Sequence, residues 1–152
     1  MIARNGTSLM TMRSEAGFSL IEIIIVVVIV GILATIALPA YQDSVRKGQR
    51  SDAKAGLLGV ASRMEQFMLD RGTYTVDMED LGYDDDPMVT TEAHYTIDAA
   101  ACADGTIATC YVLTATPQTT SPQSGDAACT TFVLSRSGAK SATGSNADEC
   151  WH

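Results

Sequence analysis

One carboxylate, Glu22, stands near the start of a long apolar stretch and has the clearest chemistry to perform in this chain. Residues 18–38 number 21, which at about 1.5 Å per helical residue gives about 31 Å, the thickness of a bilayer's hydrocarbon core. A carboxylate inside such a span is costly unless it is paired, so we expect Glu22 to meet a cation. The alternative is that Glu22, five residues into the span, reaches back toward the lipid headgroups.

The four cysteines form a second set of reactive side chains: Cys102, Cys110, Cys129 and Cys150. No Cys-x-x-Cys pair occurs, which disfavours a thiol oxidoreductase or a zinc ribbon. Four cysteines allow three disulfide pairings, and such bonds persist in oxidising compartments. We favour Cys102–Cys110, which would staple a hairpin, and Cys129–Cys150, which would close a 22-residue loop worth about 3 kcal/mol.

The remaining candidate residues are better explained by structural roles than by catalysis or metal binding. His94 and His152 are the only histidines, and neither a Gly-x-Ser-x-Gly motif nor a phosphate-binding glycine loop occurs, so we expect no enzyme. The acidic run at 84–86 could attract calcium, but EF-hand spacing is absent and a solvated loop is favoured; we expect no metal and no cofactor. His94 is expected at a strand edge on the surface, and Trp151 is expected to pack beside a disulfide.

The charge balance argues against nucleic acid as a partner. The formal net charge is −8, and removal of residues 1–17 takes away Arg4, Arg13 and Glu15, which makes it −9. Nonspecific binding to DNA depends on Lys and Arg facing phosphates, so an acidic isolated subunit is not expected to bind nucleic acid.

Basic residues concentrate in one place after the apolar span. We expect this group to form a solvated or lipid-headgroup-facing stripe on a helix. Its members are Arg46, Lys47, Arg50 and Lys54. By the positive-inside rule, these basic residues argue against an external C-terminal domain. The cysteines argue for one, and we give the cysteines more weight.

Periodicity predicts the elements that position these residues. One helix is expected from about residue 18 to about residue 69, bent at Pro39 and ended by Gly72. Its second half carries an apolar stripe at helical spacing, formed by Ala53, Leu57, Ala61, Met64 and Met68.

The rest of the chain favours strands, with a loop over residues 72–93 and a turn-rich connection over 117–128. Gly105 and Gly138 suit hairpin turns. The expected strands lie near 95–98, 111–115 and 131–134, with a weak fourth near 140–142. About 110 residues follow the span, enough for one small domain. The fold class is therefore α+β, with a long N-terminal helix packed on a small antiparallel sheet.

The N-terminal pattern resembles the class III signal of type IV prepilins. A polar leader ends in Gly17, Phe18 follows, Glu22 lies five residues past the glycine, and Gly31 and Pro39 come later. The resemblance implies a leader at 1–17, a transmembrane and assembly helix at 18–39, and a pilin head at 40–152. The true start could be Met1, Met10 or Met12.

The resemblance also implies roles for single residues. A prepilin peptidase would cut between Gly17 and Phe18 and methylate the new amine of Phe18. Glu22 would face the N-terminal amine of a neighbouring subunit. Gly31 and Pro39 would loosen or kink the helix in the filament.

For the whole chain the resemblance implies a structural subunit of a type IV pilus. The C-terminal disulfide Cys129–Cys150 and the segment around it resemble the tail of the minor pilin PilE group, so we expect a minor pilin. Its partners would be other pilins through the N-terminal helix, the peptidase and an inner-membrane assembly platform. It would wait in the inner membrane with its head in the periplasm, and then join the extracellular filament.

Four alternatives stay open at this point. A pseudopilin of a type II secretion system would share the leader, Glu22 and the long helix, but its head usually lacks the C-terminal disulfide loop. A cleaved secretory signal peptide would have a shorter apolar region. An anchored calcium- or ligand-binding domain would use the acidic run at 84–86, and an anchored enzyme would lack any visible motif.

Overall fold

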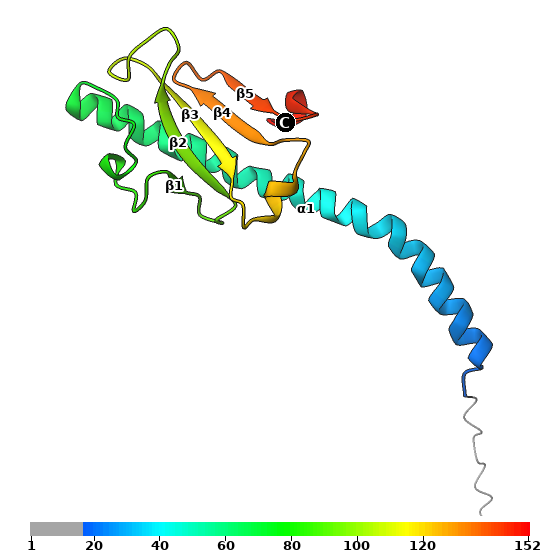
Figure 1. Ribbon diagram of the computed structural model, residues 1–152. Coiled ribbons are helices and arrows are strands. Elements are labelled where there is room, and N and C mark those ends of the chain that lie inside the picture. Colours follow the sequence, from blue (N-terminus) through cyan, green and yellow to red (C-terminus); the bar gives the residue numbers. More distant parts are fainter. Residues whose placement is uncertain (1–16) are drawn as a thin grey trace, which may run out of the picture. The chain divides into compact units, whose positions relative to one another are not determined.

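The computed structural model describes residues 17–152 (Figure 1). The chain divides into two compact units that meet between Pro39 and Ala40, and the second unit is the head. The expected leader up to Ala16, including the alternative starts at Met10 and Met12, lies outside the described residues.

A single helix, α1, runs from Leu20 to Arg71. It begins where the backbone N–H of Ile23 donates to the carbonyl of Ser19 at 3.2 Å. It ends where Gly72, with φ of 73°, donates its N–H to the carbonyl of Met68 at 2.9 Å. Glycine adopts this left-handed conformation without strain, so the predicted stop is confirmed. The predicted limits of the helix are correct to within two residues.

Five antiparallel strands form one sheet in the order β1-β2-β3-β4-β5. The strands are β1 (Met88–Val89), β2 (Tyr95–Ala101), β3 (Tyr111–Pro117), β4 (Thr131–Ser135) and β5 (Lys140–Thr143). The four predicted strands are confirmed. The expectation that all of 72–93 is loop was wrong, since β1 pairs there with β2 through Met88 and Ile97.

Three short 3-10 turns complete the head: η1 (Glu79–Leu81), η2 (Pro122–Gly125) and η3 (Ala147–Glu149). The turns η1 and η2 lie in segments expected to be a loop and a turn-rich connection. In η2, Pro122 follows Ser121, whose side chain accepts the N–H of Gln123 at 3.2 Å. This is the hydrogen bond that a helical N-cap makes.

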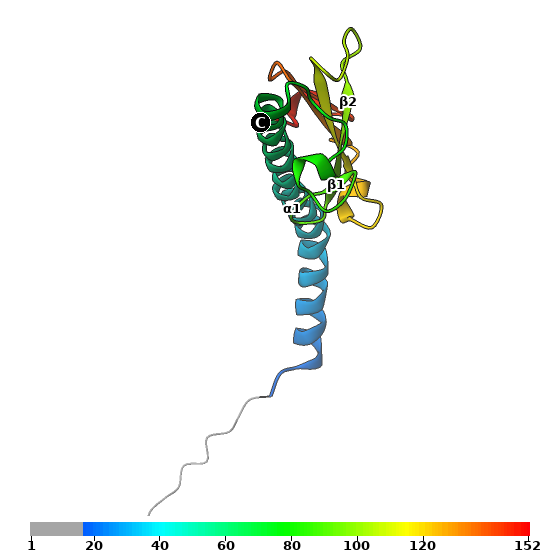
Figure 2. The same cartoon turned by 90° about the vertical axis from the view of Figure 1, so that its left-hand side faces the viewer.

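The core lies between one face of the sheet and the second half of α1. In β2, burial alternates so that Tyr95, Ile97 and Ala99 face inward, as period-two packing requires. From α1 the buried apolar side chains are Ala53, Leu57, Val60 and Met64. Figure 2 shows the strands along one side of this part of α1.

Candidate assembly site and the disulfide-bonded head

The N-terminal residues of the predicted cleavage and assembly motif lie at the start of α1. Gly17 and Phe18 precede the helix, and the Phe18 side chain is 79% exposed. Glu22 lies in the first turn of α1. The unpaired N–H groups at a helix N-terminus carry partial positive charge and favour a carboxylate there. One acid therefore lies in the first turn of the helix, four residues after Phe18.

The apolar half of α1 exposes its side chains on every face. From Leu20 to Leu38 the large apolar side chains are half exposed or more, with Ile23 at 50% and Ile36 at 70%. By length and composition, this helix could cross a membrane. An apolar surface of this extent needs lipid or other helices to cover it. Gly31 and Pro39 both lie within α1, which stays helical through each.

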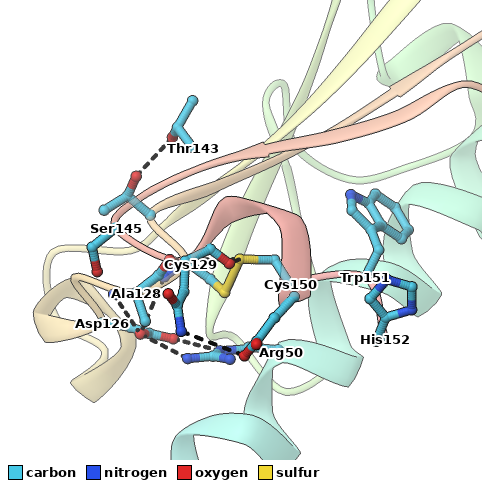
Figure 3. Close-up of a disulfide and its surroundings, with 12 residues drawn as sticks. Arg50, Asp126, Ala128, Cys129, Thr143, Ser145, Cys150, Trp151 and His152 are labelled. Atoms are coloured by element: carbon cyan, nitrogen blue, oxygen red, sulfur yellow. Dashed lines mark hydrogen bonds and ion pairs between the residues drawn. A yellow bond between two sulfur atoms is a disulfide. The ribbon is translucent and has the colours of Figure 1, made fainter.

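Arg50 departs from its predicted role as part of a solvated stripe. Its guanidinium donates to both carboxylate oxygens of Asp126, at 2.7 and 3.0 Å (Figure 3). The side chains of Arg50 and Asp126 are only 11% and 3% exposed. The pair therefore joins α1 to the loop before β4 and is part of the head's interior.

Asp126 also organises the chain that leads to the second disulfide. It accepts the N–H groups of Ala128 at 3.2 Å and Cys129 at 3.3 Å. Burial by itself would raise the pKa of Asp126, but the hydrogen bonds and charge of Arg50 and these two N–H groups lower it below its usual value. The carboxylate stays ionised because four donors converge on it.

The other members of the basic stripe lie nearer to solvent. Lys54 donates to the backbone carbonyl of His152 at 3.1 Å. Burial, then the charges of Arg50 and Lys140, lower the pKa of Lys54. Arg46 lies 3.8 Å from Asp43, a partly exposed pair of the kind that contributes little to stability.

The structure pairs Cys102 with Cys110 and Cys129 with Cys150, the two pairs favoured from the sequence. Cys129 and Cys150 are 0% and 1% exposed, whereas Cys102 and Cys110 are half-buried. The first bond closes the connection between β2 and β3, and the second ties the C-terminus to the residues before β4 (Figure 3).

Trp151 directly follows Cys150 in the chain and packs against the core. Its ring meets Phe132 edge-on at 5.8 Å between centroids, and its indole N–H donates to the carbonyl of Ser141 at 2.8 Å. That carbonyl belongs to β5, the last strand of the sheet, so Trp151 protects part of an open strand edge.

Asp52 is a buried carboxylate of α1, although the helical period of the sequence places it on the polar faces of the helix. It accepts hydrogen bonds from the Thr90 hydroxyl and from the backbone N–H groups of Glu92 and His94, both at 3.3 Å. It fastens the turn before β2 to the helix. His94 is half-buried, with Nδ1 3.0 Å from the Ser121 hydroxyl, so it is less exposed than predicted.

A second polar cluster lies at the far end of the head. The Glu65 carboxylate accepts the hydroxyls of Tyr74 and Tyr111 at 3.2 Å, and Arg136 Nε donates to the Tyr74 hydroxyl at 2.7 Å. Burial, followed by the neighbouring Glu65 charge, raises the pKa of Tyr111. The cluster links α1, β3 and the turn after β4.

The acidic run at 84–86 is exposed. Among residues 17–152 no three His, Cys, Asp or Glu side chains gather closely enough to hold a metal ion.

A long helix with an exposed apolar first half, followed by a disulfide-bonded sheet, is the architecture of a filament subunit that starts from an anchor. A sequence model described as "Type IV minor pilin ComP, DNA uptake sequence receptor" matches residues 39–133, and the prokaryotic N-terminal methylation motif matches residues 12–38. The chain belongs to the type IV pilins, and is a subunit of a pilus.

Named relatives agree with this family. Fimbrial protein EcpC of Eikenella corrodens is 35% identical over 116 residues, which cover 76% of this chain and 71% of EcpC. Type IV major pilin protein PilE of Neisseria gonorrhoeae is 43% identical over 68 residues, 45% of this chain and 41% of PilE. The PilE match thus spans less than half of that relative. This PilE is described as a major pilin, so it does not support a minor pilin. That support comes from the match to the ComP model.

One solved structure is also similar, a type IV pilin from Shewanella oneidensis. The two share 23% sequence identity with a TM-score of 0.47, over 70% of this chain and 98% of that chain.

Proposed function

We propose that this chain is a minor pilin made as a prepilin, cut between Gly17 and Phe18 and methylated on the Phe18 amine. The observation that carries the proposal is Glu22, the acid in an otherwise apolar and exposed first half of α1, inside the segment that matches the methylation motif. The enzyme would be a prepilin peptidase. The mature subunit would enter the filament from an inner-membrane assembly platform.

The role proposed for Glu22 is electrostatic. In a filament core of low dielectric, a carboxylate and an ammonium attract far more strongly than in water. An entering subunit whose Phe18 amine meets the Glu22 carboxylate of a neighbour would leave neither charge buried alone. Such pairing favours one axial stagger of adjacent helices. Bending at Gly31 and Pro39 would let the helices follow the filament.

The experiment replaces Glu22 with Ala or with Gln, which keeps the size but removes the charge. We expect both variants to fold and to insert into the membrane. The amount of each variant in sheared filaments should decrease on the order of tenfold, or ~1.4 kcal/mol. Thr35→Ala, on the same exposed half of the helix, is the matched control. Normal amounts of Glu22→Gln in filaments would overturn the pairing role.

Processing is tested separately by the mass of the N-terminal peptide from native membranes. A peptide that begins with N-methyl-Phe18 is expected, and one that keeps the leader would overturn the cleavage site. Presence in sheared pili also separates this proposal from a pseudopilin of a type II secretion system. A minor pilin should be recovered there in far smaller amounts than the main subunit.

The two disulfides support a head in the periplasm before assembly, because such bonds form in oxidising compartments. We assign the head no catalytic role and no cofactor. A phosphatase fused after His152 should be active if the head is periplasmic, and inactive if the charge-based orientation rule prevails.

The ComP model is described as a DNA uptake sequence receptor, which raises DNA as a second partner. The charges of this chain oppose it: the net charge is −8, and Arg50, within its one basic stripe, is paired with Asp126. The disulfide-closed loop 102–110 contains Asp104 and no Lys or Arg. We propose that the isolated subunit does not bind duplex DNA, and binding that weakens with added salt would overturn this.

A further inference from the structure

A groove of about 650 Å³ opens in the head between α1 and the segment that precedes β2. Figure 2 shows this segment running beside α1 in the head. The segment contributes Tyr83, Met88, Glu92 and His94 to the walls of the groove. Sites for small organic molecules usually have volumes of about 300–1,000 Å³, so the groove has the size of a ligand site.

The walls of the groove carry negative charge without a matching cation. Two carboxylates line it, Asp52 from α1 and Glu92 from the segment, and no lysine or arginine of residues 17–152 does so. Asp52 is only 9% exposed, and within the described part of the chain it forms no ion pair. Arg63 stacks on the Tyr83 ring at 4.3 Å, but its guanidinium donates to two backbone carbonyls and does not line the groove.

An unsatisfied amide oxygen lies on the same wall. The Gln49 Oε1 atom is buried and has no hydrogen-bond partner within residues 17–152. Gln49 and Asp52 are three residues apart on α1, the spacing at which helical side chains are neighbours. The backbone N–H of Glu92 donates to the Asp52 carboxylate at 3.3 Å, so Glu92 begins from the same point. Three acceptor side chains therefore lie close together, and one of them lacks a donor.

The remaining surface of the groove suits an apolar body. Val45 and Met88 provide apolar walls. A Cβ at Gly48 would meet nothing within 4 Å, and one at Gly59 would meet only the Tyr83 hydroxyl at 3.9 Å, so space is open beside both glycines. A ligand that fits must therefore combine N–H donors and positive charge at one end with an apolar part at the other.

We propose that the groove binds a small organic cation, a primary ammonium carried on a short apolar body. The three N–H donors of the ammonium would face Gln49 Oε1 and the carboxylates of Asp52 and Glu92. Its apolar body would lie on Val45 and Met88. A calcium ion would need six or more oxygens, and among residues 17–152 no three acidic, His or Cys side chains gather for a metal. Such binding is a property of the single head and does not depend on the role in the filament.

The test titrates the full-length protein, in a non-ionic detergent, with phenethylamine and separately with butylamine. NMR follows the backbone amides of Gly48, Gly59 and His94, which line the groove. At least one amine should give saturable shifts there and raise the melting temperature of the head, because it binds only the folded state. The alcohols 2-phenylethanol and butanol have the same shape without the charge, and should bind at least about tenfold more weakly than the amines.

Three variants and two matched controls test the groove itself. Gln49→Leu removes the unpaired oxygen and should weaken amine binding about tenfold. Glu92→Gln removes an exposed carboxylate and should weaken it about two- to fivefold. Ala55→Leu fills the groove and should abolish binding. Asp85→Asn removes an exposed acid that does not line the groove, and Gln66→Leu adds an apolar side chain to α1 outside it, so both should bind like wild type.

Four results would overturn the proposal. One is that neither amine shifts the groove amides, and another is that an alcohol binds as tightly as its amine. A third is that Glu92→Gln binds as well as Asp85→Asn, since the groove charge would then play no part. The fourth is equal shifts in Ala55→Leu and wild type, which would mean that the amines enter the detergent and not the groove. Recovery of the Glu22 variants in filaments is measured separately, so either proposal can fail without the other.

Discussion

At the scale of single residues, Arg50 and Asp126 join α1 to the loop before β4 by a bidentate ion pair. Both side chains are nearly buried, so each depends on the other to offset its lost hydration. The sequence indicated only a basic stripe, because nothing in the spacing of Arg46, Lys47 and Arg50 reveals an acid that lies 76 residues away. Long-range ion pairs are set by tertiary packing, which local pattern does not contain.

We predict that Arg50→Met destabilises the head by about 3 kcal/mol at neutral pH, because Asp126 is left buried without its cation. The pKa of Asp126 is lowered in the folded protein, so its contribution is present above the ordinary value of 3.8 and is lost as the pH falls through the folded-state pKa. The gap between wild type and variant in the free energy of unfolding should therefore narrow below about pH 4. Urea unfolding of the full-length protein in detergent measures it.

Arg71→Met is the control for this prediction, since Arg71 is exposed at the end of α1. Surface changes of this kind are usually within about 0.5 kcal/mol. A gap for Arg50→Met that stays constant down to pH 2 would show that the loss comes from packing rather than from the charge of Asp126.

At the scale of elements, α1 and the sheet meet closely because of one glycine. Gly56 faces Ile97 of β2 and Thr90, whose side chains would lie 2.7 and 2.9 Å from a Cβ. We predict that Gly56→Ala lowers the melting temperature, since overpacking costs about 1–3 kcal/mol. Gly59→Ala should raise it, because a Cβ there has room and alanine favours the helix by about 1 kcal/mol. Thermal unfolding followed by circular dichroism compares the two.

This pair of variants separates helix propensity from packing, because both exchange the same residues within the same helix. An equal rise in melting temperature for both variants would mean that the side chains of Ile97 and Thr90 move enough to accommodate the added methyl group. An equal fall would mean that Gly59 is packed more tightly than the 3.9 Å approach of Tyr83 indicates.

The elements that sequence reasoning found are those with a strong period. The apolar stripe of α1 and the alternation in β2, β3 and β4 each repeat several times, so burial and pattern agree. Strand β1 has two residues and follows an acidic run and Pro87, so it shows no period of its own. It exists because Met88 can pair with Ile97 at the edge of an existing strand. The burial of Asp52 was missed for a related reason, since its hydrogen-bond partners lie in the turn between β1 and β2.

At the scale of the whole molecule, the two halves of the chain have different sources of stability. The first half of α1 buries none of its apolar window within the chain and depends on lipid or on other helices. The head has its own core and two disulfides. The sequence predicted this division, because an all-apolar helix and an amphipathic one differ in composition. A groove of about 650 Å³ that α1 lines together with Tyr83, Met88 and His94 could not be predicted, because its walls come from segments far apart in the sequence.

The two disulfides of the head should differ in their resistance to reduction. Cys129 and Cys150 are fully buried, and their bond holds the 129–150 segment that includes β5 and η3. Cys102 and Cys110 are half-buried beside the connection between β2 and β3. Thiol–disulfide exchange requires access of a thiolate to the sulfur atoms. We predict that mild reductant opens Cys102–Cys110 in the native protein, whereas Cys129–Cys150 resists until the head unfolds.

Alkylation followed by peptide mass measures this order. In mild reductant under native conditions, iodoacetamide should label Cys102 and Cys110 first. Labelling of Cys129 and Cys150 should appear only when urea is added. Opening the second bond should also cost more stability, because the chain-entropy model assigns about 3 kcal/mol to its 22-residue loop and somewhat less to the shorter one. Simultaneous labelling of all four cysteines in the native protein would mean that the C-terminal segment opens without global unfolding. Trp151 and the Arg50–Asp126 pair would then be too weak to hold it closed.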